Sequence, residues 1–400
     1  MSIEKNRLTL GFVPLADAAP LLVAKERGFF ADHELEVTLS REASWASIRD
    51  KLAVGVLDAA HLLAPMPLAA TLGLGNLKEP IVTAMALNLG GNAITVSAAL
   101  FDRMAAADPA AMGKRPRTAG GLRAVIAADR AAGRPPLTFA VVYPFSAHNY
   151  ELRAWLAAAG IDPDRDIRLA VVPPPQMVSN LSAGAIDGYC VGEPWNGVAA
   201  RLGLGRVLIT SGELWAGRME KVLGVRQAWA DRYPDTHKAL LKALLQAAKW
   251  ADEPANRDEL AEILARPGHV NAPVELLRKL LRIDGPLLFH RHAANFPWRS
   301  QGLWYLAQMR RWGQLQGGVE PLRTVEQVFR SDIYRLAALE LGMAVPLVDR
   351  KVEGAHARPW VLGEATQPIA MGADAFFDGS RFDPNGPPAA REAGDIAGDA

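Results

Sequence analysis

The amino-acid sequence predicts a two-lobed α/β protein with a ligand cleft between the lobes and a helical C-terminal region. The chain has 400 residues, half of them apolar, which exceeds one ordinary domain. Short apolar runs alternate with helical patterns in two separate sets, as in α/β folds. An extended stretch broken at Gly90-Gly91 separates the two sets and suits a crossover. Clefts between such lobes bind small ligands.

The first set occupies residues 8–95. We expect a core strand at 8–13, a helix at 18–30, a strand at 35–40, a helix at 44–57 and a strand from 58. This alternation predicts a parallel sheet. An apolar run behind Lys5 and Arg7 also imitates a secretion signal, but a threonine, a glycine and a proline interrupt it, so we favour the strand.

The second set repeats the same alternation of expected strands and helices and is followed by further helices. Strands are expected at 137–144, 167–176 and 186–194, helices at 148–161 and 177–185, and a return through 206–215 and 221–230. We therefore expect lobe I at 1–95 and 215–382 and lobe II at 96–214. Residues 383–400 are rich in Pro, Gly, Ala and acid, which predicts a disordered tail.

The charge balance argues against nucleic acid and membranes as direct partners. Lys and Arg total 44 and Asp and Glu total 43, so the basic excess that holds phosphates is missing. No apolar run reaches the roughly 20 residues that a membrane helix needs. One cysteine allows no internal disulfide.

The sequence carries no motif of a hydrolase, a zinc protease or a nucleotide-binding loop. His290 and His292 stand two apart without an evident third metal ligand, and Cys190 has no evident activating partner. His61 is expected to be hydrogen-bonded near a strand end. We therefore predict a protein that is not an enzyme and that uses no metal and no cofactor.

Five groups at expected turns and strand ends can donate hydrogen bonds. They are Trp45, Asn92, His148, the backbone of Gly192, and Lys221. The alternatives are a core tryptophan, a turn asparagine, a helix-capping histidine and a solvated strand-edge lysine. Together they form a set of donors without an accompanying acid, which suits an anion that carries no proton.

The sequence around these residues resembles the nitrate- and bicarbonate-binding family of the NrtA, CmpA and NasS group. The matching segments are "FVPLADAAPLLVAKERGFF", "SWASIRDKLAVGVLDAAHLLAPMP", "LNLGGNAITVS", "HNYELRAWLAAAGIDPDRDI", "DGYCVGEPWN" and "NFPWRSQGLWYLAQMRRWG". They cover most of residues 8–335 in order. The resemblance implies a type II periplasmic-binding-protein fold.

The resemblance also implies a ligand set of Trp45, Asn92, His148, Gly192 and Lys221. In the nitrate-binding members the amide is a glutamine, and Asn92 is one methylene shorter. Bicarbonate-binding members carry an acid at the lysine position, so Lys221 favours nitrate or nitrite. On this basis Lys221→Glu is expected to abolish nitrate binding and to leave the fold intact.

The start of the chain, seven residues before the first expected strand, is most like the cytoplasmic sensor NasS. That likeness implies a cytoplasmic nitrate or nitrite sensor that holds an RNA-binding antiterminator of the NasT type. The alternative is the solute-binding component of an ABC transporter for nitrate or a related anion. A third hypothesis, an enzyme of thiamine-pyrimidine synthesis, expects a cysteine-rich motif that one cysteine does not supply.

Overall fold

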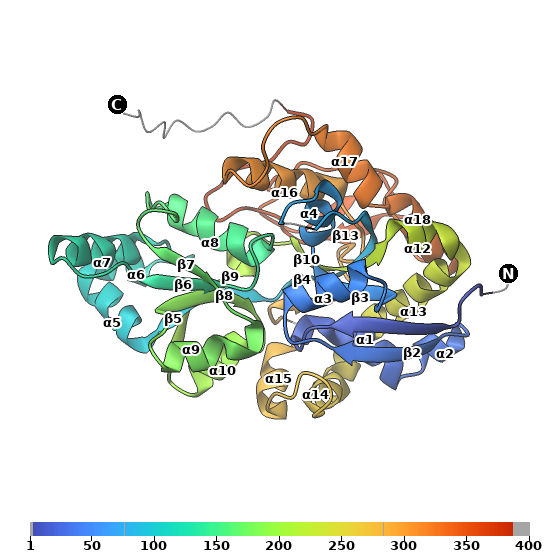
Figure 1. Ribbon diagram of the computed structural model, residues 1–400, viewed down its shortest axis with the longest axis horizontal. Helices are drawn as coiled ribbons and strands as arrows, with labels where there is room; N and C mark the ends of the chain where they lie inside the picture. The colour runs from blue at the N-terminus through green and yellow to red at the C-terminus, as the bar shows by residue number, and fades with distance from the viewer. Residues whose placement is uncertain (1–2, 76, 283, 387–400) are drawn as a thin grey trace.

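The computed structural model describes residues 3–75, 77–282 and 284–386, and its strands form two large sheets and a separate pair, β12 (Trp360–Leu362) with β13 (Ile369–Met371) (Figure 1). The first sheet has the order β11 (Leu287–Leu288), β4 (Ile81–Gly90), β10 (Met219–Arg226), β3 (Ala59–Leu63), β1 (Arg7–Phe12) and β2 (Glu36–Arg41). The second has the order β7 (Arg168–Val171), β6 (Thr138–Val141), β8 (Gly188–Gly192), β5 (Asn92–Ser97) and β9 (Gly205–Thr210). We call the parts built on these sheets lobe I and lobe II.

Helices cover both sheets. In the N-terminal part of lobe I they are η1 (Ala16–Ala18), α1 (Ala19–Glu26), α2 (Phe29–Asp32), α3 (Trp45–Ala53) and α4 (Met66–Leu72). Lobe II carries α5 (Ala98–Ala107), α6 (Pro109–Gly113), α7 (Gly120–Ala131), α8 (Ala147–Ala157), η2 (Pro174–Gln176), α9 (Met177–Ser182), α10 (Trp195–Arg201) and α11 (Ser211–Leu214). The predicted tail falls largely at residues 387–400, outside the described residues; the predicted lobe boundaries stay a prediction.

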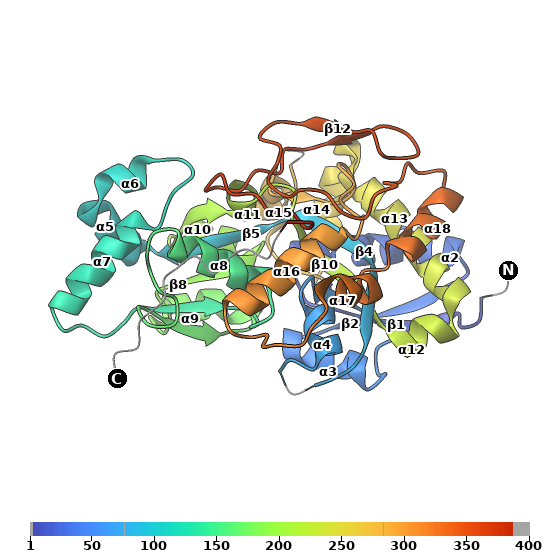
Figure 2. The same cartoon turned by 90° about the horizontal axis from the view of Figure 1, so that it is seen from above.

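The C-terminal third is mostly helical, as the sequence predicts. Its helices are α12 (Gln227–Arg232), α13 (Pro234–Asp252), η3 (Pro254–Asn256), α14 (Arg257–Ala265), α15 (Val274–Leu280), α16 (Arg299–Arg311), α17 (Pro321–Val328) and α18 (Ser331–Glu340). α13 packs against α1 and α18. A closing segment with β12 (Trp360–Leu362) and β13 (Ile369–Met371) runs across the top of the view in Figure 2. Trp215 stacks on Phe376 of that segment, with ring centroids 4.4 Å apart.

The chain changes lobes at Gly90 and Gly91, between β4 and β5. Both residues have positive φ, 69° and 94°, a region that glycine adopts without steric cost. A Cβ on Gly90 would lie 2.6 Å from the Pro286 carbonyl oxygen, so a side chain does not fit there. The return runs from β9 through α11 to β10, and the Asn92 N–H donates to Ser211 Oγ at 3.1 Å, which joins the two crossings.

The prediction of a parallel sheet is correct only in part. In lobe I, β1 pairs in parallel with β2 and β3, whereas β10 is antiparallel to both β3 and β4. In lobe II, β6 pairs in parallel with β7 and β8, whereas β5 is antiparallel to β8 and β9. Parallel neighbours need a crossover connection within one sheet, and these strands instead enter their sheet from the other lobe.

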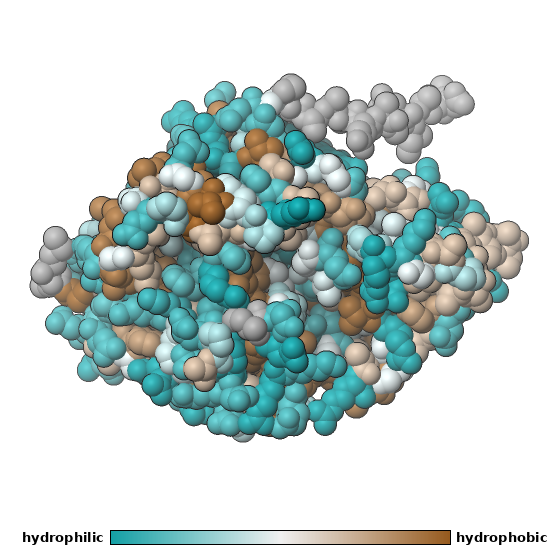
Figure 3. Space-filling view, turned by 180° about the vertical axis from the view of Figure 1, so that it is seen from behind, coloured by the Kyte–Doolittle hydropathy of each residue, from teal (hydrophilic) through white to brown (hydrophobic). Residues whose placement is uncertain are grey.

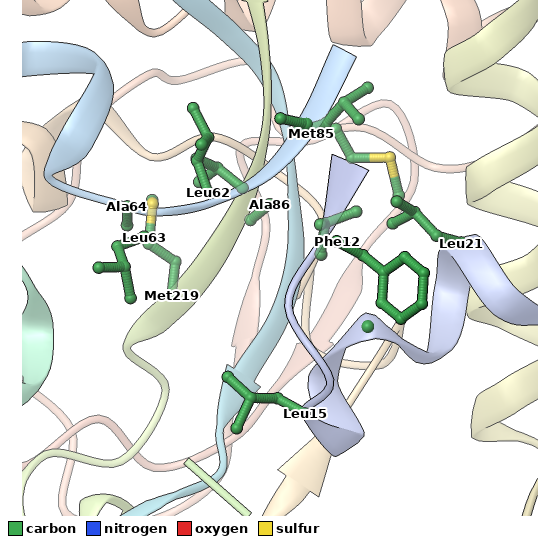
Figure 4. Packing of buried hydrophobic residues seen from close by; sticks show 14 of the residues in the cluster. Phe12, Leu15, Leu21, Leu62, Leu63, Ala64, Met85, Ala86 and Met219 are labelled. Atoms are coloured by element: carbon green, nitrogen blue, oxygen red, sulfur yellow. The ribbon is translucent and has the colours of Figure 1, made fainter. Parts of the chain in front are cut away.

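The core of lobe I explains why its strands are continuous apolar runs rather than alternating ones. All five residues of β3 are buried, and so are residues 81–89 of β4, because helices cover both faces of the sheet. Figure 4 shows core residues from four different strands, with Phe12 beside Leu21 on one side and Met219 beside Leu63 and Ala64 on the other. A second apolar cluster, which includes Phe139 and Trp155, fills lobe II.

Polar residues dominate the outer surface, and apolar ones occur in small groups on the face drawn in Figure 3. Among the described residues, no helix combines the length and the apolar character that crossing a membrane requires.

Candidate anion-binding site

The five predicted site residues come from both lobes. Trp45 is the first residue of α3, and His148 is the second residue of α8. Both helices begin with a capping serine whose hydroxyl accepts a backbone N–H, Ser44 and Ser146 respectively. Lys221 lies in β10 of lobe I. Asn92 and Gly192 face each other in the antiparallel pair β5 and β8 of lobe II.

The structure brings these residues together in the interior. Lys221 Nζ lies 5.6 Å from the ring centroid of Trp45. A Cβ added to Gly192 would lie 3.5 Å from Asn92 Oδ1, and His148 Nδ1 is 3.4 Å from Glu220 Oε1, beside Lys221. The four side chains are at most 1% exposed. The solvated strand-edge lysine considered for Lys221 is therefore excluded.

The expectation of donors without an accompanying acid is wrong. Lys221 Nζ donates to Asp17 Oδ2 at 2.7 Å and to Glu220 Oε1 at 2.9 Å. Neighbouring residues of a regular strand point to opposite faces, but the register of β10 against β4 shifts on both sides of Lys221. This irregularity lets Glu220 reach the neighbouring ammonium group, which the sequence pattern does not reveal.

Asp17 also lies against a neutral histidine. The Val13 N–H donates to His61 Nδ1 at 3.4 Å, so the other ring nitrogen, Nε2, carries the hydrogen, and it lies 3.0 Å from Asp17 Oδ1. Burial lowers the pKa of His61 despite the neighbouring carboxylate. The His61 ring meets the Trp45 ring edge-on at 5.3 Å. Asp17 is thus held between a cation and a neutral donor.

A second buried cation joins the lobes behind Lys221. Arg218 donates to Glu151 Oε1 of α8 at 2.5 Å and to Glu220 Oε2 at 2.6 Å. Asn92 Nδ2 donates to Glu151 Oε2 at 3.0 Å. The amide donor of Asn92 is therefore in use, and its Oδ1 faces Gly192. Arg218, Glu151 and Glu220 are functional candidates that sequence reasoning missed.

The pKa shifts follow from burial and from these charges. Burial alone would lower the pKa of Lys221, but Asp17 and Glu220 outweigh it and raise the pKa. Burial would raise the pKa of Asp17 and of Glu220, and the neighbouring cations lower both instead. Burial lowers the pKa of His148 to about 3. At neutral pH the site therefore presents a charged lysine and a neutral histidine.

Four polar atoms of the predicted site have no hydrogen-bond partner among the described residues. They are Trp45 Nε1, Asn92 Oδ1 and both ring nitrogens of His148, all fully enclosed. A buried polar group without a partner costs roughly 1–3 kcal/mol, so such groups are rare in folded proteins. The indole N–H of Trp45 can supply a hydrogen bond to a small acceptor enclosed beside Lys221, and the neutral ring of His148 can supply one from the nitrogen that carries its hydrogen.

The other polar residues singled out in the sequence serve the fold. His290 Nδ1 lies 2.9 Å from Asn295 Oδ1, and His292 Nδ1 lies 2.9 Å from the Ala370 carbonyl oxygen. Cys190 is buried, and burial raises the pKa of its thiol well above the usual range. Within the ranges that the structure describes, no three His, Cys, Asp or Glu side chains are grouped as metal ligands.

The two lobes are in contact around the site. The Ala16 N–H donates to the Glu193 carbonyl oxygen at 2.8 Å, which joins η1 to the end of β8. Arg49 Nη1 donates to Tyr143 Oη at 2.6 Å, which joins α3 to lobe II. With the Arg218–Glu151 pair, these contacts enclose the predicted site between the lobes.

Comparison with known proteins finds a family model, curated relatives and a solved structure that point to the same group of binding proteins. Residues 2–265 match the model of the NMT1-like family. The nitrate/nitrite binding protein NrtA of Synechococcus elongatus is 35% identical over 96% of this chain and 85% of the relative. The crystal structure of the periplasmic nitrate-binding protein NrtA from Synechocystis superposes with a TM-score of 0.81 at 30% identity, covering 96% of this chain and 97% of the other. The α/β periplasmic-binding-protein fold is thereby confirmed.

Other relatives are longer. The nitrate import ATP-binding protein NrtC of Synechocystis is 40% identical over 96% of this chain, which covers 54% of the relative. The bicarbonate transport ATP-binding protein CmpC of Synechococcus elongatus is 41% identical over 86% of this chain and 50% of the relative. The chain thus spans about half the length of these ATP-binding relatives.

Proposed function

Because the chain belongs to the NMT1-like family, among relatives of the NrtA and CmpA type, we propose that it binds nitrate or nitrite between its lobes. The observation that carries the proposal is the buried Lys221 ammonium, enclosed with the unpartnered indole N–H of Trp45 and the neutral ring of His148. A planar monoanion accepts hydrogen bonds from several directions. Each charge-assisted bond contributes roughly 1.5–3 kcal/mol.

The relatives include proteins named for nitrate and proteins named for bicarbonate, so the ligand of this chain depends on the groups in its own site. Bicarbonate carries a proton that needs an acceptor, whereas nitrate only accepts. In the described structure both carboxylates on Lys221 already accept from its ammonium group. The orphan groups that remain include the indole N–H of Trp45, which only donates, and Asn92 Oδ1, which only accepts. The preference for nitrate or nitrite is therefore supported by the NrtA relatives rather than by the unpartnered groups alone.

Isothermal titration calorimetry with nitrate, nitrite and bicarbonate tests the proposal. We expect nitrate or nitrite to bind with one ion per chain. Lys221→Met should weaken that binding, whereas Lys51→Met, at a half-exposed lysine paired with Glu42, should leave it unchanged. Heat of binding from bicarbonate alone would contradict the proposal.

The proposed biological role is that of the solute-binding component of an ABC transporter for nitrate or a related anion. The likeness to NrtA and to about half of the ATP-binding protein NrtC supports this role. The finer hypothesis from the sequence, a cytoplasmic nitrate sensor with an antiterminator of the NasT type as its partner, stays a prediction.

Affinity purification of the chain from cells grown without nitrate distinguishes the two roles. Recovery of a permease or an ATPase supports transport. Recovery of an RNA-binding antiterminator that millimolar nitrate releases supports sensing, and in that case the transporter role would be wrong.

A further inference from the structure

Lys221 is shared by two carboxylates before any ligand is considered. Its Nζ lies 2.7 Å from Asp17 Oδ2 and 2.9 Å from Glu220 Oε1, and the three side chains are at most 1% exposed. An ammonium group has three hydrogen-bond donors. One donor therefore remains for a ligand, and that ligand must approach two fixed negative charges.

The acids of the buried network outnumber its cations. Arg218 and Lys221 supply two positive charges against the three carboxyl groups of Asp17, Glu151 and Glu220. Burial raises the pKa of Glu151, whereas the neighbouring cations lower the pKa of Asp17 and of Glu220. The nearby histidines His61 and His148 add no positive charge, because burial lowers the pKa of both. An anion that enters the site therefore meets the ionised carboxylates of Asp17 and Glu220 beside Lys221.

Asp17 lies between two residues of the proposed site. Its Oδ2 lies 3.5 Å from where a Cβ of Gly192 would be, on the other lobe. The neighbouring Ala16 N–H donates to the Glu193 carbonyl oxygen at 2.8 Å, which fixes this segment against the end of β8. The carboxylate of Asp17 is thus held between Lys221 and Gly192, two of the groups proposed to hold the anion.

We propose that Asp17 is a specificity-determining residue that restricts the site to monoanions. Coulomb repulsion scales with the product of the charges, so one fixed carboxylate opposes a dianion such as sulfate twice as strongly as it opposes nitrate. The cost is not relieved by water, because Asp17 is 1% exposed. This inference rests on the proposed anion-binding function and specifies the class of ligand.

Calorimetry with sodium nitrate and sodium sulfate at constant ionic strength tests the inference. The wild-type chain should bind nitrate and reject sulfate. Asp17→Asn and Asp17→Ser, measured in parallel, should each lower the ratio of the sulfate Kd to the nitrate Kd at least tenfold. The control is Asp58→Asn: Asp58 is a buried acid that contacts Thr9 N and Trp229 Nε1 before the start of β3, and its loss should leave the ratio unchanged.

The outcomes separate the inference from the function on which it rests. If the wild-type chain binds no nitrate or nitrite, the proposed function fails and the inference falls with it. If nitrate binds but both Asp17 variants keep the wild-type ratio, only the inference is overturned. The inference is also overturned if both variants fold but bind neither nitrate nor sulfate, since Asp17 would then only position Lys221. Equal affinity of the wild-type chain for sulfate and nitrate would overturn it as well.

Discussion

Removing the positive charge of Lys221 tests the site and the fold together. Lys221→Met keeps most of the apolar stem but leaves the carboxylates of Asp17 and Glu220 without their shared ammonium. Glu220 retains Arg218 at 2.6 Å, whereas Asp17 retains only the neutral His61 at 3.0 Å. In Lys221→Met, Asp17 is therefore a buried carboxylate without a cationic partner, and this unpaired charge lowers the free energy of unfolding.

The expected loss is large for both stability and binding. Breaking a buried ion pair by removing one partner costs about 3–5 kcal/mol, so we expect the free energy of unfolding to fall by that amount. One charge-assisted hydrogen bond to nitrate, worth about 1.5–3 kcal/mol, corresponds to a loss of roughly 10- to 150-fold in affinity. Lys221→Glu would add a third carboxylate to this cluster, so the expectation that it leaves the fold intact does not agree with the structure.

Urea unfolding and nitrate calorimetry measure the two effects. Asp17→Asn should recover part of the stability lost in Lys221→Met, because the double variant no longer buries an unpaired carboxylate, and such neighbours couple. The reasoning would be refuted if Lys221→Met unfolds within about 0.5 kcal/mol of the wild type, which is the range of ordinary surface substitutions.

Three further substitutions have defined outcomes. Burial raises the pKa of Glu193 from 4.5 to about 7, so the folded state holds this proton more tightly than the unfolded state. The free energy of unfolding should therefore fall by about 3 kcal/mol as the pH rises from 4.5 to 7. Urea unfolding at pH 5 and pH 8 should show this fall in the wild type and a smaller one in Glu193→Gln. An equal pH dependence of the free energy of unfolding in both proteins would contradict the prediction. His148→Ala should weaken nitrate binding by about tenfold, less than Lys221→Met, because one neutral donor is lost. Since burial lowers the pKa of His148 to about 3, the nitrate Kd of the variant should change with pH between pH 5 and pH 8 as it does in the wild type. Calorimetry that shows a different pH dependence would oppose a neutral His148 in the site. Trp45→Phe keeps a ring beside Lys221 but removes Nε1, so the nitrate Kd should rise roughly 10- to 150-fold, as for the loss of one hydrogen bond to a charged group. An unchanged Kd would remove Trp45 from the donor set.

The sequence predicts much of the fold because its signals are local. Alternating apolar runs mark the strands, and Gly90-Gly91 marks the crossing because only glycine adopts its backbone angles at low cost. The direction of β5 and β10 is not local, since it depends on how the chain enters each sheet from the other lobe. For this reason the parallel prediction is wrong at the strands beside the crossings.

The candidate site shows the same division. Trp45, Asn92, His148, Gly192 and Lys221 stand at predicted turns and strand ends, and the structure gathers them. Asp17 contacts Lys221 across 204 residues of sequence, and Glu220 contacts it through an irregular strand register. Neither contact leaves a periodic pattern, so the acids that determine the charge of the site were missed.

The single, buried cysteine has a practical consequence for observing motion. Cys190 is fully enclosed, and its thiol resists ionisation, so a thiol-reactive dye should react with cysteines introduced at the surface and spare the native one. Val56 of lobe I and Val171 of lobe II are 59% and 56% exposed, and fluorophores attached at these two positions would form a donor and acceptor pair across the lobes. Energy transfer within single molecules could then follow opening and closing without a preliminary cysteine-free background.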